Sequence, residues 1–239
     1  MCSIAGMINL QKTKIQDITH KLDVMNALQK HRGPDDTGIW TNQHMYVGLA
    51  HNRLSILDLT DCGHQPMKDE ATGNVICFNG EIYNYIELRK EIGGVFRTNT
   101  DTEVILKAYE KWGSDCVIHF KGMFAFVIWD EKNQTLFCAR DRFGIKPFYY
   151  AVVDYVFYFS SEMKALLPFL PDIETDIDGF KDYLTFQFCL KEHTLFKGIK
   201  VLEPAHQMII HDENLKIKRY WQVFYDLDWN HTEKFFVDK

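Results

Sequence analysis

The sequence of 239 residues lacks an apolar run of the roughly 20 residues that a membrane-spanning helix requires. It also lacks a basic excess, because 27 Lys and Arg residues face 33 Asp and Glu residues, for a net charge of −6. Nucleic-acid affinity rests mainly on Lys and Arg contacts to phosphates, so we expect no nucleic-acid partner. The first ten residues have no basic stretch before their apolar residues. We therefore expect no signal peptide, no membrane partner and a cytoplasmic location.

Several common catalytic patterns are also missing. There is no phosphate-binding G-x-x-x-x-G-K-[ST], no dinucleotide-binding G-x-G-x-x-G, no hydrolase G-x-S-x-G and no zinc-binding H-E-x-x-H. The ten histidines never occur four residues apart. The six cysteines are scattered, without a C-x-x-C pair, so we expect neither disulfides nor structural zinc.

What is present is ordinary globular composition, with 46% hydrophobic and 14% aromatic residues. Periodicity and turn signals predict helices over 17–29, 85–92, 101–112, 160–167 and 178–186. They predict strands over 2–10, 45–56, 75–78, 123–129, 135–139, 148–153 and 156–160, a last hairpin from 201–210 and 216–221, and loops over 31–38 and 58–67. Strands and helices cluster rather than alternate, which favours an α+β fold over a doubly wound parallel sheet.

The second residue is chemically unusual. Removal of Met1 would give Cys2 both a thiol and a free α-amino group. An α-amine has an unperturbed pKa of roughly 7.7–8.0, so it can act as the base for the thiol beside it without a histidine. A second feature, Asn79-Gly80, ends a short apolar run and is by itself a typical hairpin turn.

The surrounding segments resemble a known family. They include Met1 to Gly6, His31 to Asp35, Leu49 to Ile56, Gly63 to Met67, Phe78 to Asn84, Thr100 to Glu103, Gly122 to Phe126, Ala139 to Pro147, Tyr183 to Gln187 and Thr194 to Ile199. In this order, over about residues 1–221, they resemble the class II (N-terminal nucleophile) glutamine amidotransferase domain of the glutamine-hydrolysing asparagine synthetases. The resemblance implies a four-layer α/β/β/α sandwich of two antiparallel sheets with helices outside.

The resemblance also implies catalytic roles. Cys2 would attack the side-chain amide of L-glutamine, giving a glutamyl thioester and ammonia, and water would then release L-glutamate. The side chain of Asn79 and the backbone N–H of Gly80 would stabilise the tetrahedral oxyanion. No metal or cofactor is expected in this domain.

Substrate recognition would require a pair of opposite charges. The resemblance assigns the α-carboxylate of glutamine to Arg53 and its α-ammonium group to Asp101. The residues expected to shape the pocket around them are Leu54, Ser55, Ile56, Leu57 and Glu81, together with Asn79 and Gly80. The loop 31–35 is expected near the site without a catalytic step, and 140–147 is expected to be structural.

Two positions depart from the family pattern, since Ser3 and Ala205 stand where glycine is usual. Ser3 puts in doubt the backbone freedom beside the nucleophile. The sequence also contains no S-G-G-x-D-S phosphate loop of a synthetase domain. We therefore expect a glutaminase domain at 2–221, and at 222–239 the start of a connection to a C-terminal synthetase domain. ATP and magnesium belong only to that absent domain, and a homodimer is compatible with the sequence.

Three functions follow from this reading. The first is glutamine hydrolysis as the ammonia-supplying half of an asparagine synthetase. The second is an amidotransferase domain that delivers ammonia to another acceptor, such as a sugar. The third is a degenerate, non-catalytic domain used for assembly, for which Ser3 is the only indication.

Overall fold

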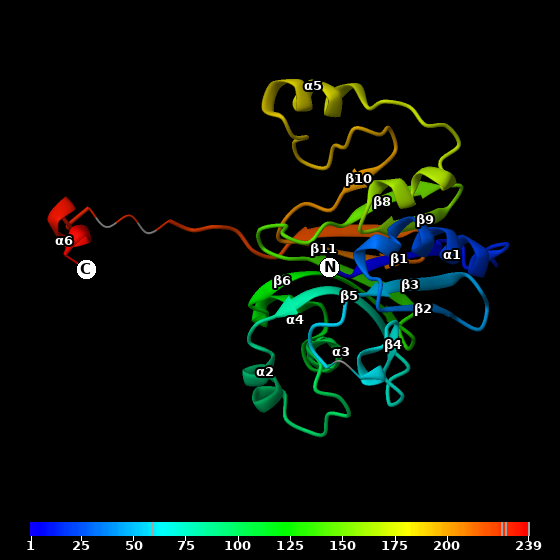
Figure 1. The fold of residues 1–239 in the computed structure, drawn as a ribbon, viewed down its shortest axis with the longest axis horizontal. Coiled ribbons are helices and arrows are strands. Elements are labelled where there is room, and N and C mark those ends of the chain that lie inside the picture. The colour runs from blue at the N-terminus through cyan, green and yellow to red at the C-terminus, as the bar shows by residue number, and fades with distance from the viewer. Residues whose placement is uncertain (59, 226, 228, 239) are drawn as a thin grey trace.

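The computed structural model describes residues 1–58, 60–225, 227 and 229–238, which form two antiparallel sheets (Figure 1). The first sheet has the order β2 (Asp36–Thr41), β3 (Val47–Arg53), β1 (Ser3–Asn9), β9 (Val156–Ser160), β8 (Tyr149–Val153) and β10 (Lys200–Val201). The second has the order β4 (Met67–Lys68), β5 (Val75–Ile82), β6 (Gly122–Asp130), β7 (Thr135–Arg140), β11 (His206–His211) and β12 (Asn214–Arg219).

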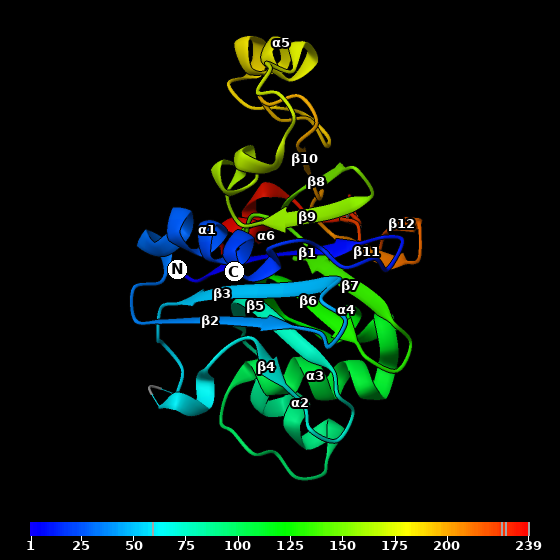
Figure 2. The same cartoon turned by 90° about the vertical axis from the view of Figure 1, so that its right-hand side faces the viewer.

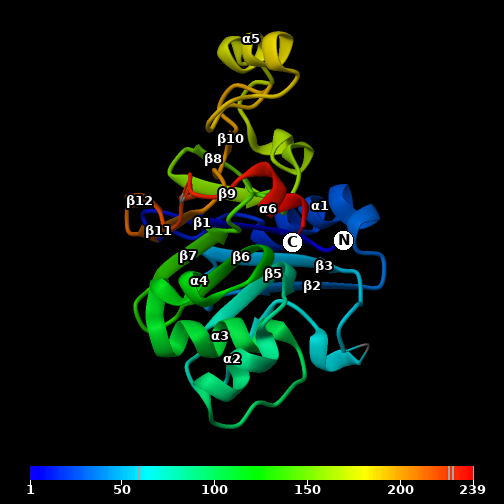
Figure 3. The same cartoon turned by 90° about the vertical axis from the view of Figure 1, so that its left-hand side faces the viewer.

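Helices cover the outer faces of both sheets, as Figures 2 and 3 show from opposite sides. The first sheet carries α1 (Ile18–Gln29), and the second carries α2 (Tyr85–Ile92), α3 (Asp101–Trp112) and α4 (Cys116–His119). Two further helices, α5 (Ile177–Phe186) and α6 (Glu233–Val237), lie away from the sandwich in Figure 1. The four layers confirm the α/β/β/α sandwich expected from the resemblance.

Three apolar clusters hold the layers together. Between the sheets, Leu49 of β3 and Val127 and Trp129 of β6 belong to one fully buried cluster. A second cluster joins the other face of β6 to α3, and a third joins β1 and β3 to α1. Burial of apolar surface on both faces of β1 fixes the strand that carries the residue after the nucleophile.

Most predicted elements are present, and some boundaries differ. Helices over 85–92 and 101–112 are confirmed residue for residue. The helix expected over 160–167 is wrong, because two short 3-10 turns, Met163–Ala165 and Leu167–Phe169, stand there. Ser160 still belongs to β9, where it pairs with Ala5 and Tyr149, and Pro168 disfavours α-helical backbone at the residue before it. Other 3-10 turns span Lys30–Arg32, Asp61–Gly63 and Gly113–Asp115.

The start of β2 was expected to be loop. Asp36, Thr37 and Gly38 have loop-like composition, but they pair with β3 at the edge of the first sheet. The turn typical of Asn79-Gly80 is also absent, since both residues continue β5 and pair with Ala125 and Phe124.

Of the residues expected to begin a connection, 226, 228 and 239 lie outside the described residues. The preceding hairpin is present, but its strands are β11 and β12 rather than 201–210 and 216–221, because Val201 pairs with β8 in the first sheet. Across the described residues, no helix combines the length and apolar character that crossing a membrane would need.

Candidate active site

A small cleft lies where the start of β1, the end of β3, the middle of β5 and the first turn of α3 meet. It is lined by Cys2, Arg53, Leu54, Ile56, Leu57, Gly63, Gln65, Phe78, Gly80, Glu81, Thr100, Asp101 and Thr102. The structure thus brings together every predicted site residue except Ser55 and Asn79, which do not line the cleft. The backbone N–H of Ser55 instead donates to the carboxylate of Asp35, at 2.8 Å.

The Cys2 thiol lies against the backbone of Leu54. Its Sγ is 3.5 Å from the carbonyl oxygen and 3.4 Å from the amide nitrogen of Leu54. Burial raises the pKa of this thiol, while the Leu54 hydrogen bond, the chain N-terminus and the cations of Arg53 and Lys146 act in the opposite direction. Met1 is still attached and is about half exposed, so the α-amine is one residue away from the thiol.

The oxyanion-binding candidates occupy adjacent positions on β5. Asn79 is 1% exposed, and among the described residues its Nδ2 has no hydrogen-bond partner. An unpaired buried donor is rare in native structures. Gly80 lies so close to β6 that a Cβ there would come 2.1 Å from the carbonyl oxygen of Met123. The strand can therefore approach β6 at this point only with glycine.

The peptide before Asn79 is held from both sides by side chains to which the sequence analysis gave no role. The N–H of Phe78 donates to Gln65 Oε1 at 2.6 Å, and its carbonyl lies 3.0 Å from His51 Nε2. Burial lowers the pKa of His51 to about 4, so the ring is neutral at pH 7 and its Nε2–H donates to Phe78. His51 and Gln65 both occur in the quoted family segments. No local sequence pattern indicates their contacts with Phe78, which is 27 and 13 residues away.

The predicted recognition residues, Arg53 and Asp101, both line the cleft. Arg53 is 6% exposed, and its guanidinium donates to the carbonyls of Leu57, Asp58 and Thr60. These bonds fix the loop that follows β3. A Cβ at Gly63 would come 1.9 Å from Arg53 Nη2, so this glycine makes room for the guanidinium.

Asp101 begins α3 and is 4% exposed. Its Oδ2 accepts the backbone N–H of Ile82 at 2.9 Å, which ties the helix to β5. Burial raises the pKa of Asp101 to about 6, and this effect outweighs the hydrogen bonds that favour the carboxylate. The helix starts here because the Thr100 hydroxyl caps it by accepting the N–H of Glu103, at 3.3 Å.

The loop 31–35, expected near the site, contacts the nucleophile residue. Arg32 donates to the carbonyl of Cys2 at 3.1 Å and pairs with Glu162. In 140–147, Arg140 and Asp141 bind surrounding backbone, in line with a structural role. Lys146 departs from that expectation, because its Nζ reaches Met1 Sδ at 3.2 Å.

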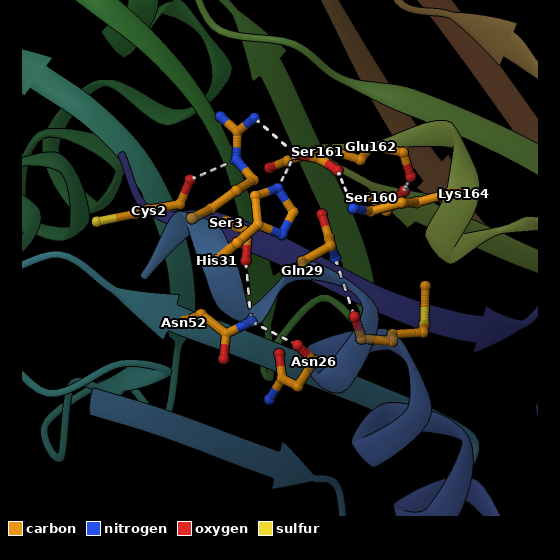
Figure 4. A network of polar contacts seen from close by, with 12 residues as sticks. Cys2, Ser3, Asn26, Gln29, His31, Asn52, Ser160, Ser161, Glu162 and Lys164 are labelled. Atoms are coloured by element: carbon orange, nitrogen blue, oxygen red, sulfur yellow. Dashed lines mark hydrogen bonds and ion pairs between the residues drawn. The ribbon is translucent and has the colours of Figure 1, made fainter. Parts of the chain in front are cut away.

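Ser3 is fully buried on β1 and has a defined partner. Its Oγ accepts a hydrogen bond from Asn52 Nδ2 at 3.1 Å, and the same amide group donates to Asn26 O at 2.9 Å (Figure 4). Thr37 donates to the other end of the Asn52 amide. The serine beside the nucleophile is therefore accommodated in a paired polar network.

None of the six cysteines is in a disulfide, and Cys77, Cys116 and Cys138 are buried. No cluster of metal-ligating side chains occurs within the part of the chain that the structure describes.

The chain is similar to known proteins in both sequence and fold. A sequence model of the family described as glutamine amidotransferase domain matches residues 1–221. The glutamine-hydrolysing asparagine synthetase 3 of Bacillus subtilis is 40% identical over 98% of this chain and 38% of its own length. A putative glutamine-hydrolysing asparagine synthetase 2 of Methanocaldococcus jannaschii is 40% identical over 92% of this chain and 46% of its own length. The chain thus spans less than half of each relative.

Among solved structures, the glutamine phosphoribosylpyrophosphate amidotransferase of B. subtilis superposes with a TM-score of 0.65, at 17% identity. The match covers 93% of this chain and 50% of that one. At this identity the likeness concerns the fold, and it agrees with the two packed sheets. The match over 221 residues supplies the family itself. The chain belongs to the glutamine amidotransferase family.

Proposed function

We propose that this domain hydrolyses L-glutamine to L-glutamate and ammonia through a thioester on Cys2. The observation that supports this most is the shared cleft. Cys2, Gly80 of the strand that also carries Asn79, and the charged residues Arg53 and Asp101 line this one space, which supports the proposal. In its whole protein the domain would supply ammonia to a synthetase domain that makes asparagine with ATP and magnesium.

The chemistry begins once Met1 is removed. The α-amine of Cys2 takes the thiol proton, and Sγ attacks the amide carbon of glutamine. The Asn79 side chain and the Gly80 N–H stabilise the negative charge that develops on the amide oxygen. Collapse of this intermediate transfers that proton from the α-ammonium group to the leaving nitrogen and releases ammonia. Water, deprotonated by the same amine, then hydrolyses the thioester to glutamate and regenerates the thiol. The domain's own residues perform these steps without a metal or cofactor.

Asp101 and Arg53 bind the amino-acid end of glutamine. The carboxylate of Asp101 pairs with the α-ammonium group, and the cation of Arg53 attracts the α-carboxylate. The Arg53 guanidinium already binds three backbone carbonyls. It can therefore meet the substrate without ordering a long side chain, which lowers the entropic cost of binding.

The test is glutamate release by protein whose first residue is Cys2, as verified by mass spectrometry. Cys2→Ala should abolish turnover, by about 10⁴-fold or more if removal of the nucleophile acts as in subtilisin. Cys189→Ala, a matched change outside the cleft, should leave turnover unchanged. Protein that retains Met1 should be inactive, because its Cys2 nitrogen is part of a peptide bond.

A non-catalytic assembly domain would release no glutamate in any of these forms. Full activity with Met1 attached would instead refute the α-amine as the base. The acceptor of the ammonia is tested separately, by supplying aspartate, ATP and magnesium to the full-length protein and measuring asparagine.

A further inference from the structure

Lys146 is a buried cation to which the proposed mechanism assigns no step. It lies in the loop between β7 and β8 and is 4% exposed. Its backbone N–H donates to Asp141 Oδ2 at 3.0 Å, which fixes the position from which the side chain extends. No carboxylate of the described residues forms an ion pair with it within 4.0 Å. Burial of an ammonium group without such a partner is costly, which makes the position notable.

The side chain of Lys146 extends to the end of the chain that catalysis requires. Its Nζ contacts Met1 Sδ at 3.2 Å, and a thioether is only a weak acceptor. Met1 is the residue whose removal creates the α-amine of Cys2. Lys146 is also near enough to the Cys2 thiol that each group affects the titration of the other. Loss of Met1 therefore removes this contact of the Lys146 ammonium group and leaves the group close to the residue that becomes the new N-terminus.

Several other charges surround the same point, and the effect of Lys146 adds to theirs. They are Arg32 before β2 with its partner Glu162 after β9, Arg53 at the end of β3, Glu81 on β5, Asp101 on α3 and Asp141 after β7. The nearest cations, Arg32 and Arg53, already bind backbone carbonyls. Lys146 is the cation among them whose polar contact at Nζ is with the residue to be removed.

The consequence of this placement follows from charge alone. The α-amine and thiol of Cys2 together carry two protons in acid, with net charge +1, and the reactive pair carries one. Loss of the first proton lowers the positive charge, whether it leaves from nitrogen or sulfur, so a neighbouring cation favours that loss. Two unit charges interact in water by about 1 kcal/mol at about 4 Å and by less at a longer distance, so the effect amounts to at most about one pH unit.

We propose that Lys146 is a positioning residue whose positive charge keeps the Cys2 amine–thiol pair singly protonated, and hence reactive, near neutral pH. The inference rests on the proposed function for its purpose, but its physical content concerns Cys2 alone. It therefore has a readout that does not require glutamine.

The experiment measures the rate at which iodoacetamide alkylates Cys2 as a function of pH. The labelled N-terminal peptide is quantified by mass spectrometry in protein that starts at Cys2. Lys146→Met removes the charge and keeps the length of the side chain. It should shift the pH profile of Cys2 labelling to higher pH, by up to about one pH unit. Lys146→Arg should follow the wild type, as should the matched control Lys181→Met, whose side chain is 70% exposed on α5. An unmoved profile in Lys146→Met would overturn the proposal.

Glutamate release separates this idea from the proposed function. The acidic limb of kcat/KM should shift with the labelling profile in Lys146→Met and return with Lys146→Arg. A uniform loss at every pH, with the limb in place, would mean that Lys146 is merely structural and would refute the proposal. If the wild type released no glutamate while Lys146→Met still shifted the labelling profile of Cys2, the proposed function would fail and the role of Lys146 would stand. Lys146→Gln provides the same test should Lys146→Met fold poorly.

Discussion

The reacting and the substrate-binding candidates differ in how their polar groups are satisfied before any substrate is present. On β5, next to the cleft, the buried Nδ2 of Asn79 has no partner among the described residues. In the cleft itself, Arg53 binds three backbone carbonyls, and Asp101 accepts the N–H of Ile82. A buried donor without a partner costs stability, whereas these charged groups also hold local structure. The difference separates residues that serve the reaction from residues that also serve the fold.

After the nucleophile itself, the largest effect is expected at Asn79, whose buried amide nitrogen is unpaired among the described residues. Asn79→Ala removes an oxyanion donor, which by the subtilisin precedent lowers kcat by roughly 10²–10³, or about 2.7–4 kcal/mol. KM should be nearly unchanged, because the donor acts on charge that develops in the transition state. Steady-state kinetics of glutamate release measures both quantities.

The same variant tests the contrast through stability. Because Nδ2 has no partner in the part of the chain that the structure describes, Asn79→Ala should cost less stability than an ordinary buried truncation, at most about 1 kcal/mol in urea unfolding. A kcat at the wild-type level would exclude Asn79 from the oxyanion site. A large stability loss would show instead that its amide supports the strand.

The next largest effect is expected at Asp101, whose carboxylate already accepts a hydrogen bond from the fold. Asp101→Asn keeps an oxygen that can accept the Ile82 N–H but removes the charge that meets the α-ammonium of glutamine. KM should rise about 30-fold, near 2 kcal/mol, with a smaller fall in kcat. In the wild type, KM should also rise as the pH falls below about 6, since the carboxylate then becomes protonated. An unchanged KM would mean that the recognition role does not transfer to this position.

Asp101→Asn should weaken substrate binding but increase the free energy of unfolding at neutral pH. The pKa of Asp101 is about 6 in the folded protein, against an ordinary value of 3.8, so the folded state binds more protons between these values. The free energy of unfolding of the wild type therefore falls as the pH rises through this window. Asp101→Asn should be about 2–3 kcal/mol more stable at pH 7 and show little difference near pH 4. Asp178→Asn, on exposed α5, should change stability by less than about 0.5 kcal/mol.

Elements defined by local signals could be predicted from the sequence, and elements held by distant segments could not. Helix α3 was predicted with correct ends because Thr100 caps it locally and Gly113 follows it. Edge strand β2 was missed because its Asp, Thr and Gly residues have loop composition, and only pairing with β3 holds them. At the cleft, family resemblance located Cys2 and Asp101.

Other site features depend on contacts between distant segments. The clamp of His51 and Gln65 on Phe78 joins β3, the loop before β4, and β5. The reach of Lys146 to Met1 spans almost 150 residues of sequence. Local residue patterns carry no information on such contacts, because the sheet register that creates them is set by the whole sandwich.

The smallest effect is expected at Ser3, which lies next to the nucleophile but whose side chain belongs to the polar network of the fold. Ser3→Ala removes the acceptor for Asn52 Nδ2, which still donates to Asn26, so the loss should be about 1 kcal/mol of unfolding free energy. Ser3→Gly, the residue usual in the family, should lose up to about 1 kcal/mol more, because glycine gains freedom in the unfolded chain. Both variants should keep kcat and KM within about twofold. If Ser3→Gly instead raised kcat tenfold, the serine would restrain the nucleophile, and the division between reacting and structural groups would fail at this residue.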